Sequence, residues 1–329
     1  MRSLLLVIVA IGTTSAIAGD PVALETAISR GLDFVAKDSI AWRTEHSCAA
    51  CHHAALAVWA FRDAKARGIA VDDTLLQELN QQMSDAGDGR FNGERPAEKP
   101  KALNAKALYF SLALSQNPDP AAAAHDGTKL LLSTVKSDQT EDGSWMAWHE
   151  LRHPFFFSSD ECATILGVLA VLTAADAGDA EAAAARDKGV AWLTTHTADN
   201  HDLQTLALRI ALWNRLGRPH EESQSWVDLL RSRQSADGGW SQTSEMASDA
   251  WATGQALYAL GLSGAGPDDE SVSRGQQFLI STQRDDGGWP MTSRPMKPGG
   301  QGSGSLIPII GGGSAWGVLG LIASSERPG

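Results

Sequence analysis

The sequence is poor in cysteine, in tyrosine and in positive charge. Of its 329 residues only three are cysteine and two are tyrosine, and 27 Lys and Arg face 39 Asp and Glu, which gives a net charge of -12. Three cysteines are too few for a scaffold built from disulfides. The acidic balance, without a run of basic residues, argues against nucleic acid as a partner. The cysteines that are present therefore need a specific chemical explanation.

No apolar run near the N-terminus is long enough to cross a bilayer, which takes about 20 residues. The chain begins with Arg2, continues with the apolar residues 4–11 and reaches the small-residue site Ala16-Ile17-Ala18. This layout is typical of a cleavable secretory signal. We therefore expect a signal peptide over residues 1–18 and a mature, periplasmic or secreted chain without an integral membrane segment.

One short motif, Gln-x-x-Asp-Gly-x-Trp, recurs along the chain. Near-complete copies lie at 139–145, 234–240 and 283–289, and a degenerate copy lies at 88–91. Each follows an amphipathic stretch with helical spacing. Asp-Gly favours a tight turn with a positive-φ glycine, and tryptophan supplies apolar area with one hydrogen-bond donor. The motif therefore predicts a clamp at a helix C-terminus, joining neighbouring helical hairpins.

Two kinds of helical pattern alternate around these motifs. Amphipathic stretches, expected on the outside, lie near 23–37, 72–84, 120–136, 180–196, 219–234 and 268–282. Stretches that are apolar on nearly every side, expected to be buried all round, lie near 48–67, 101–115, 160–175, 202–216, 249–262 and 314–324. Six hairpins are enough to close a ring, so we predict an all-α fold, an α/α toroid (α6/α6 barrel), as one domain over residues 19–329. An open helical solenoid is the alternative.

The repeated motif resembles the QW motifs of squalene-hopene cyclases, and a single ring of six hairpins resembles the prenyltransferase β subunit of the same terpenoid cyclase superfamily. The resemblance covers nearly the whole mature chain. It implies that the inner helices begin around one opening of a central cavity, where polar function would lie. Such clamps are structural and say little about the reaction.

The segment Cys48-Ala-Ala-Cys51-His52 opens the first inner helix. In an exported protein it resembles the c-type haem attachment site, in which two thiols reach the vinyl groups and the imidazole binds the iron. Haem c is then the expected cofactor and His52 the metal ligand, with His53 as a solvent-facing or second-shell neighbour. A disulfide or redox dithiol, another metal such as zinc, and an inert role remain open. Candidates for a sixth ligand are His149, His153, His201, Met146, Met291 and Met296.

The segment 158–164 opens the third inner helix and resembles the Asp-x-Asp-Asp-Thr-Ala segment of squalene-hopene cyclases. This resemblance puts Asp160 at the proton-donating acid and Ser158 where the first carboxylate would be. The loss of that carboxylate weakens the case for cyclase chemistry. A plainer interpretation makes Asp160 a helix N-cap, as expected for Asp249 at the matching point of the fifth inner helix.

The same segment resembles the Asp-x-Cys zinc pair of prenyltransferase β subunits, with Asp160 and Cys162 as the candidates. That family completes its site with a histidine at the start of a later inner helix. The equivalent position here is Leu203, and His201 lies two residues before it. Zinc at this pair is the alternative to haem as a cofactor.

The loops at 145–157 and 290–313 are long, and the first is rich in aromatic residues. They suit a flat apolar ligand, which could be an isoprenoid-like molecule or the haem itself. The sequence thus favours an exported toroid with a hydrophobic pocket and a c-type haem, acting in electron transfer or redox chemistry with a redox partner protein. The alternatives are a terpenoid cyclase-like enzyme that uses Asp160 as acid on an isoprenoid substrate, and a ligand-binding or interaction module without turnover.

Overall fold

The computed structural model describes residues 21–45, 53–87, 104–115, 124–147, 159–196, 202–294 and 306–326. These segments form twelve helices, which alternate between an outer and an inner layer. The outer helices are α1 (Pro21–Glu45), α3 (Asp73–Gly87), α6 (Asp126–Ser137), α8 (Ala180–Thr195), α10 (His220–Ser232) and α12 (Glu270–Thr282). The inner helices are α2 (Ala54–Ala66), α4 (Ala105–Ser115), α7 (Asp160–Asp176), α9 (Leu203–Arg215), α11 (Ala250–Leu262) and α13 (Ile307–Ser324).

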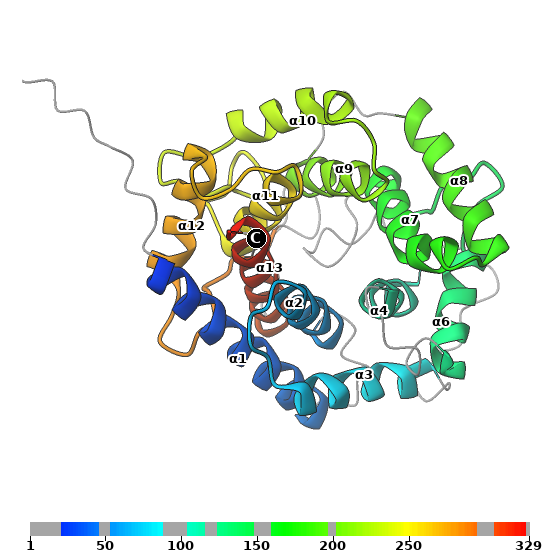
Figure 1. The fold of residues 1–329 in the computed structure, drawn as a ribbon, viewed down its shortest axis with the longest axis horizontal. Coiled ribbons are helices and arrows are strands. Elements are labelled where there is room, and N and C mark those ends of the chain that lie inside the picture. The colour runs from blue at the N-terminus through cyan, green and yellow to red at the C-terminus, as the bar shows by residue number, and fades with distance from the viewer. Residues whose placement is uncertain are drawn as a thin grey trace, which may run out of the picture.

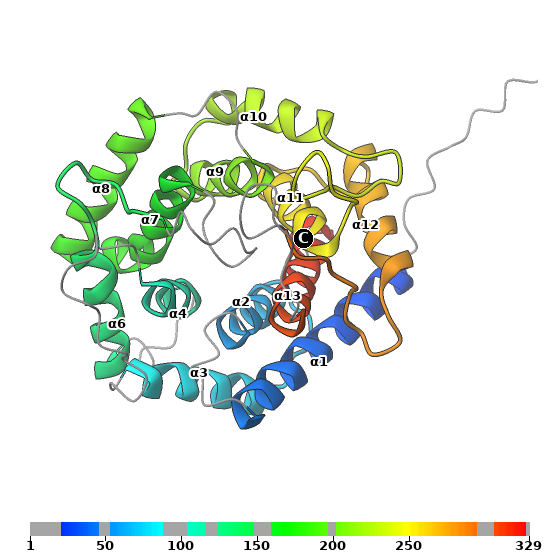
Figure 2. The ribbon, with the colours of Figure 1, turned by 180° about the vertical axis from the view of Figure 1, so that it is seen from behind.

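The inner helices form a closed ring, as Figures 1 and 2 show from opposite sides. Around it, α2 packs on α4, α4 on α7, α7 on α9, α9 on α11, α11 on α13, and α13 on α2 again. The outer helices surround this ring, and α1 packs against α13 as well as α2. The predicted toroid is therefore confirmed, and the open solenoid is wrong. The described residues include no strand, only one isolated bridge between Ser241 and Ser248.

The three near-complete repeats are clamps, as predicted. Their tryptophans, Trp145, Trp240 and Trp289, are fully buried. Each indole Nε1 donates a 2.8 Å hydrogen bond to a carbonyl of the helix before it, namely that of Val135, Leu230 or Leu279. The glycine after each aspartate has positive φ, from 89° to 96°. The degenerate copy at 88–91 lies outside the described residues.

The glutamine that opens each repeat joins one outer helix to the next. Gln139 Nε2 donates to the carbonyl of Ala185 in α8, at 2.8 Å. Gln234 donates in the same way to Ser271 in α12, also at 2.8 Å. The third copy donates to Ala27 in α1, at 3.0 Å, and so ties the last hairpin to the first. The repeats therefore join neighbouring outer helices, and the third copy also closes the ring.

Four helix boundaries differ clearly from the sequence expectation. The first inner helix, α2, begins at Ala54 and not at residue 48, and α6 begins at Asp126 and not near 120. The last inner helix begins at Ile307, not near residue 314, and α1 continues to Glu45 instead of ending near 37. A proline in the first turn of α13 is compatible with a helix start. The glycines that follow it suggest a loop in isolation, but Gly311 lies where α1 and α2 come too close for a side chain. A Cβ there would lie 2.4 Å from Asp38 Oδ2.

Among the described helices, only α13 is long and apolar enough to cross a membrane. Of its 18 residues, 83% are buried inside the protein. It packs against α1, α2, α11 and α12. Its apolar composition is explained by this position in the inner ring, because a core helix has no polar face to offer solvent.

Candidate functional site at the mouth of the barrel

The inner helices begin at a shared end of the barrel, which we call the mouth. Arg294, five residues after the third clamp tryptophan, lies within electrostatic reach of groups at or near the starts of four inner helices: Tyr109, Cys162, Asp202 and Asp249. Burial lowers the pKa of Arg294. The starts of α2 and α13 also meet, because Gly311 lies against His53. The expectation that the inner helices begin at one common end is therefore met by these residues.

The motif residues Cys48, Cys51 and His52 lie outside the described residues, whereas the next residue, His53, is well defined by its contacts. Its side chain is fully buried, and Nε2 lies 3.2 Å from Asp38 Oδ2 of α1. The imidazole stacks on Trp42, with ring centroids 4.6 Å apart. Burial raises the pKa of Asp38 to about 6. His53 is thus anchored between α1, α2 and α13, and the solvent-facing alternative is wrong.

The N-cap of α7 is Ser159, not Asp160. Ser159 has an extended backbone (φ -155°, ψ 162°), and its hydroxyl accepts a 3.1 Å hydrogen bond from the N–H of Cys162. Asp160 is one position later, so its carboxylate points back to the first clamp loop and accepts a 2.7 Å hydrogen bond from the Ala147 N–H. The N-cap interpretation is correct for Asp249, whose Oδ1 accepts from Ala252 N at 2.9 Å.

The second proposed zinc ligand, Cys162, is a fully buried cysteine in the first turn of α7. Leu203, which takes the position of the zinc-binding histidine in the prenyltransferase resemblance, is the first residue of α9 and is buried. Its N-cap is Asp202, and His201 lies outside the described residues. Within the described ranges no three His, Cys, Asp or Glu side chains are grouped as they would be around a metal ion.

Of the candidate sixth haem ligands, Met146 and Met291 fall in the described ranges. Met291 is buried with its sulfur against Gly313 in α13: a Cβ at that glycine would lie 2.5 Å from Sδ. Met146 is only partly buried, beside the loop that Asp160 holds. The other four candidates lie outside the described residues.

Asp249, which the sequence predicts only as a helix N-cap, is also a buried acid. It is 6% exposed, and Gln242 Nε2 donates a 2.5 Å hydrogen bond to its second oxygen, Oδ2. Burial raises the pKa of Asp249 from 3.8 to about 6. An aspartate before an apolar helix predicts a cap, but the pattern does not show that the clamp loop folds back and covers it.

The stability of the protein is expected to depend on the protonation of Asp249. Because its folded-state pKa is above the unfolded value, this group stabilises the fold fully below about pH 4, and the contribution is lost as the pH rises through about 6. A shift of this size corresponds to about 3 kcal/mol. Relative to an Asp249→Asn variant, the wild type should therefore lose stability between about pH 4 and 7 in urea unfolding. Parallel pH profiles of the two proteins would contradict this assignment.

The inner face of the barrel is lined by aromatic residues of the inner helices. Trp316 of α13 makes edge contacts with Trp59 of α2 and with Trp251 and Tyr258 of α11, at centroid distances of 5.4, 6.2 and 5.7 Å. All four are almost fully buried. Gln255 lies one turn from Trp251 and is 1% exposed, and neither atom of its amide has a hydrogen-bond partner among the described residues. The tryptophans of the inner helices, more than the two tyrosines, supply the aromatic surface.

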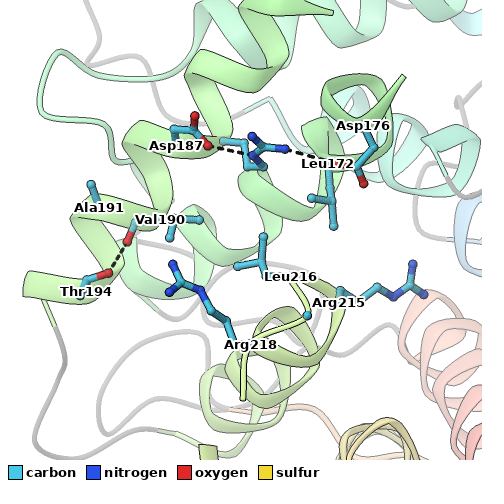
Figure 3. Close-up of a pocket in the computed structure, with 11 residues that line it drawn as sticks. Leu172, Asp176, Asp187, Val190, Ala191, Thr194, Arg215, Leu216 and Arg218 are labelled. Carbon is cyan, nitrogen blue, oxygen red and sulfur yellow. Dashed lines mark hydrogen bonds and ion pairs between the residues drawn. The ribbon is translucent and has the colours of Figure 1, made fainter. Parts of the chain in front are cut away.

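A cleft of about 680 Å³ lies at the other end of the barrel, where α7 and α9 end beside α8. Figure 3 shows its apolar side chains, Leu172, Val190 and Leu216, with Arg218 directed toward them. Arg186 in its wall is neutralised by Asp176 and Asp187, at 3.2 and 2.9 Å. This cleft is remote from the mouth and from Asp160.

Comparison with solved structures shows the fold. The chain matches a type II terpene cyclase, MstE from Scytonema, solved as a variant with its substrate geranylgeranyl dihydroxybenzoate (10% identity, TM-score 0.58, 92% of this chain and 97% of that one). It also matches a protein from Actinoplanes (13%, 0.60, 92% and 99%) and a polysaccharide lyase (11%, 0.54, 90% and 96%). No protein-family model and no curated protein matches the chain. Identities this low establish a shared helical toroid and leave the reaction open.

Proposed function

We propose that the protein is an exported helical toroid that carries a c-type haem at the mouth of its barrel and acts in electron transfer or redox chemistry. The observation that carries the proposal is the segment Cys48-Ala-Ala-Cys51-His52, which directly precedes His53 and the inner helix α2. The thiols of Cys48 and Cys51 would hold the haem, and His52 would bind its iron. A bound haem supplies one-electron redox chemistry.

The described residues next to this segment fit such a role. The first residues of α2, Ala54, Ala55 and Leu56, are each 1% exposed, so the helix is packed into the core from its first turn. The helix has no side-chain cap, because His53 makes no capping hydrogen bond and is held instead by Asp38. A fixed residue directly after the motif restricts where His52 can lie, as an iron ligand requires.

The proposal is tested by expressing the protein together with the c-type maturation machinery. We expect sharp visible absorption bands and a positive haem stain after denaturing electrophoresis, both absent from a Cys48→Ala, Cys51→Ala variant. A matched control is Cys162→Ala, which removes the buried thiol of α7 and should leave the stain unchanged. An unstained wild type with stoichiometric zinc would contradict haem and would support the Asp160 and Cys162 pair.

A second candidate is acid-dependent chemistry on an apolar, isoprenoid-like substrate. It is favoured by the aromatic interior and by the fold shared with a terpene cyclase whose substrate carries a geranylgeranyl group. Asp160 is the acid that the sequence suggests, but its Oδ1 accepts a backbone hydrogen bond from Ala147. Asp249 is the other candidate acid, because burial raises its pKa to about 6 and so keeps it protonated to higher pH, although both of its oxygens also accept hydrogen bonds. A ligand-binding module without turnover would use the same interior. Analysis of the products formed from an isoprenoid-like substrate separates the enzyme from the binding module.

A further inference from the structure

Four side chains form a polar cluster at the end of the barrel opposite the mouth, and we call them the basal cluster: Arg62 and Asp63 of α2, Arg215 of α9 and Tyr258 of α11. In the inner ring α13 separates α2 from α11, so the cluster spans the interior and does not follow one helix interface. It lies outside the motif at the mouth and has no part in the function proposed above.

Tyr258 is the centre of the cluster. Arg215 Nη2 donates a 2.7 Å hydrogen bond to its hydroxyl, which also hydrogen-bonds to Asp63. The tyrosine ring is 2% exposed and makes an edge contact with Trp59, with centroids 5.6 Å apart. In Figure 3 the side chain of Arg215 runs away from the outer cleft and from Arg218. Arg215 therefore faces the barrel interior, although its backbone borders the cleft.

The charges of this cluster do not balance. Among the described residues, two guanidinium groups, of Arg62 and Arg215, accompany one carboxylate, that of Asp63, and Arg67 also lies within electrostatic reach of it. Burial and repulsion from Arg215 lower the pKa of Arg62 to about 10, although Asp63 opposes the shift. Burial also raises the pKa of Asp63 despite the arginines around it. Because Arg62 is partly exposed, solvent shields part of this positive charge, and a bound anion would compensate the rest.

Arginines at the C-terminal ends of inner helices could simply satisfy free helix carbonyls. Arg67 does so, since its Nη2 donates to the carbonyl of Ala323 at the end of α13, at 2.9 Å. Arg62 is different, because its guanidinium makes no hydrogen bond to any of the described residues. Arg62 and Asp63 are partly exposed, so solvent reaches them. Binding to free helix carbonyls therefore explains Arg67. It does not explain Arg62, whose N–H groups bond to none of the described residues.

We propose that the basal cluster is an anion-binding site, in which Arg62 and Arg215 bind an oxyanion such as a carboxylate or phosphate group. Guanidinium groups suit this chemistry because their planar donors match two oxygens at once. The bound anion would balance the second cation, while Tyr258 keeps Arg215 in place.

The test is isothermal titration of the purified protein with inorganic phosphate and, separately, with acetate and benzoate. We expect saturable binding at one site, and the ranking of the three probes distinguishes phosphate, a bare carboxylate and a carboxylate with an apolar body. Arg62→Gln should weaken binding by about tenfold or more. The matched control, Arg218→Gln, removes an exposed arginine at the same end of the barrel and should leave binding unchanged.

Thermal unfolding without added anion separates a binding role from a structural one. Arg62→Gln should leave the midpoint unchanged or raise it, because it removes an uncompensated charge, whereas Arg67→Gln should lower it. The proposal is overturned if none of the probes binds saturably, or if Arg62→Gln binds as the wild type does. It is also overturned if Arg62→Gln lowers the midpoint as much as Arg67→Gln. None of these outcomes depends on the presence of haem.

Discussion

Replacing Trp289 with alanine is expected to lower the free energy of unfolding by about 3 to 5 kcal/mol. The indole is fully buried, its Nε1 donates to Leu279 O at 2.8 Å, and its ring packs 3.2 Å from the Cβ position of Gly31 in α1. The loss would therefore open a cavity and remove a hydrogen bond where the last hairpin meets the first. Urea unfolding followed by circular dichroism measures the change.

The matched control for this variant is Trp192→Ala. Trp192 is only partly buried in α8 and stacks on His196, with centroids 4.4 Å apart, so its loss should cost much less. Equal costs for the two variants, or a change below about 0.5 kcal/mol for Trp289→Ala, would contradict the assignment of the third repeat as the clamp that closes the ring.

Arg209→Met is expected to destabilise the protein by about 3 to 5 kcal/mol, because it leaves Glu161 buried without its partner. Arg209 is 1% exposed and donates to Glu161 in the first turn of α7 and to the carbonyl of Leu193 in α8. Its guanidinium also lies 5.0 Å from the ring centre of Trp213. The pair thus ties three helices together beside Asp160, and chemical denaturation measures its removal.

A double variant separates the cost of an unpaired charge from the loss of packing. Adding Glu161→Met to Arg209→Met should recover much of the stability, since an apolar pair can replace a buried ion pair. Lys37→Met breaks an exposed pair with Asp33, 3.9 Å apart, and should cost under about 1 kcal/mol. If Arg209→Met costs no more than Lys37→Met, the buried pair does not hold α7 to α9.

Much of the fold could be predicted from the sequence because its signals are local and repeated. The three copies of the clamp motif fixed where outer helices end, and uniformly apolar stretches such as α11 identified the inner layer. The start of α13 could not be predicted, because residues 311–313 are glycines and discourage a helix locally. Glycine is needed there because Gly311 lies against His53 and Asp38, which are distant in sequence, and Gly313 lies against Met291 of the third clamp loop.

The candidate site was less predictable, because the spacing of residues in the sequence does not show which side chains are buried or which ones pair. The sequence suggests matching roles for Asp160 and Asp249, yet Asp160 lies one position after the N-cap of α7, whereas Asp249 is the N-cap of α11 and is buried beneath Gln242. His53 was expected to be peripheral, but its partner Asp38 comes from a separate helix. The basal cluster joins residues of three helices, and no local pattern places Tyr258 between Asp63 and Arg215.

The shared toroid narrows the function only slightly. A terpene cyclase and a polysaccharide lyase match the chain to a similar extent, so the scaffold accommodates unrelated reactions. The residues on which the proposed function rests are the two cysteines and His52, which come directly before His53 and α2. The proposed function therefore depends on whether those cysteines bind a haem.

The mass of the intact protein, isolated from a host that exports it and matures c-type cytochromes, tests that claim most directly. We predict a single species whose mass equals that of the chain from about residue 19 onward plus one covalently attached haem. A chain of that length with two unmodified thiols, or with a disulfide between Cys48 and Cys51, would contradict it.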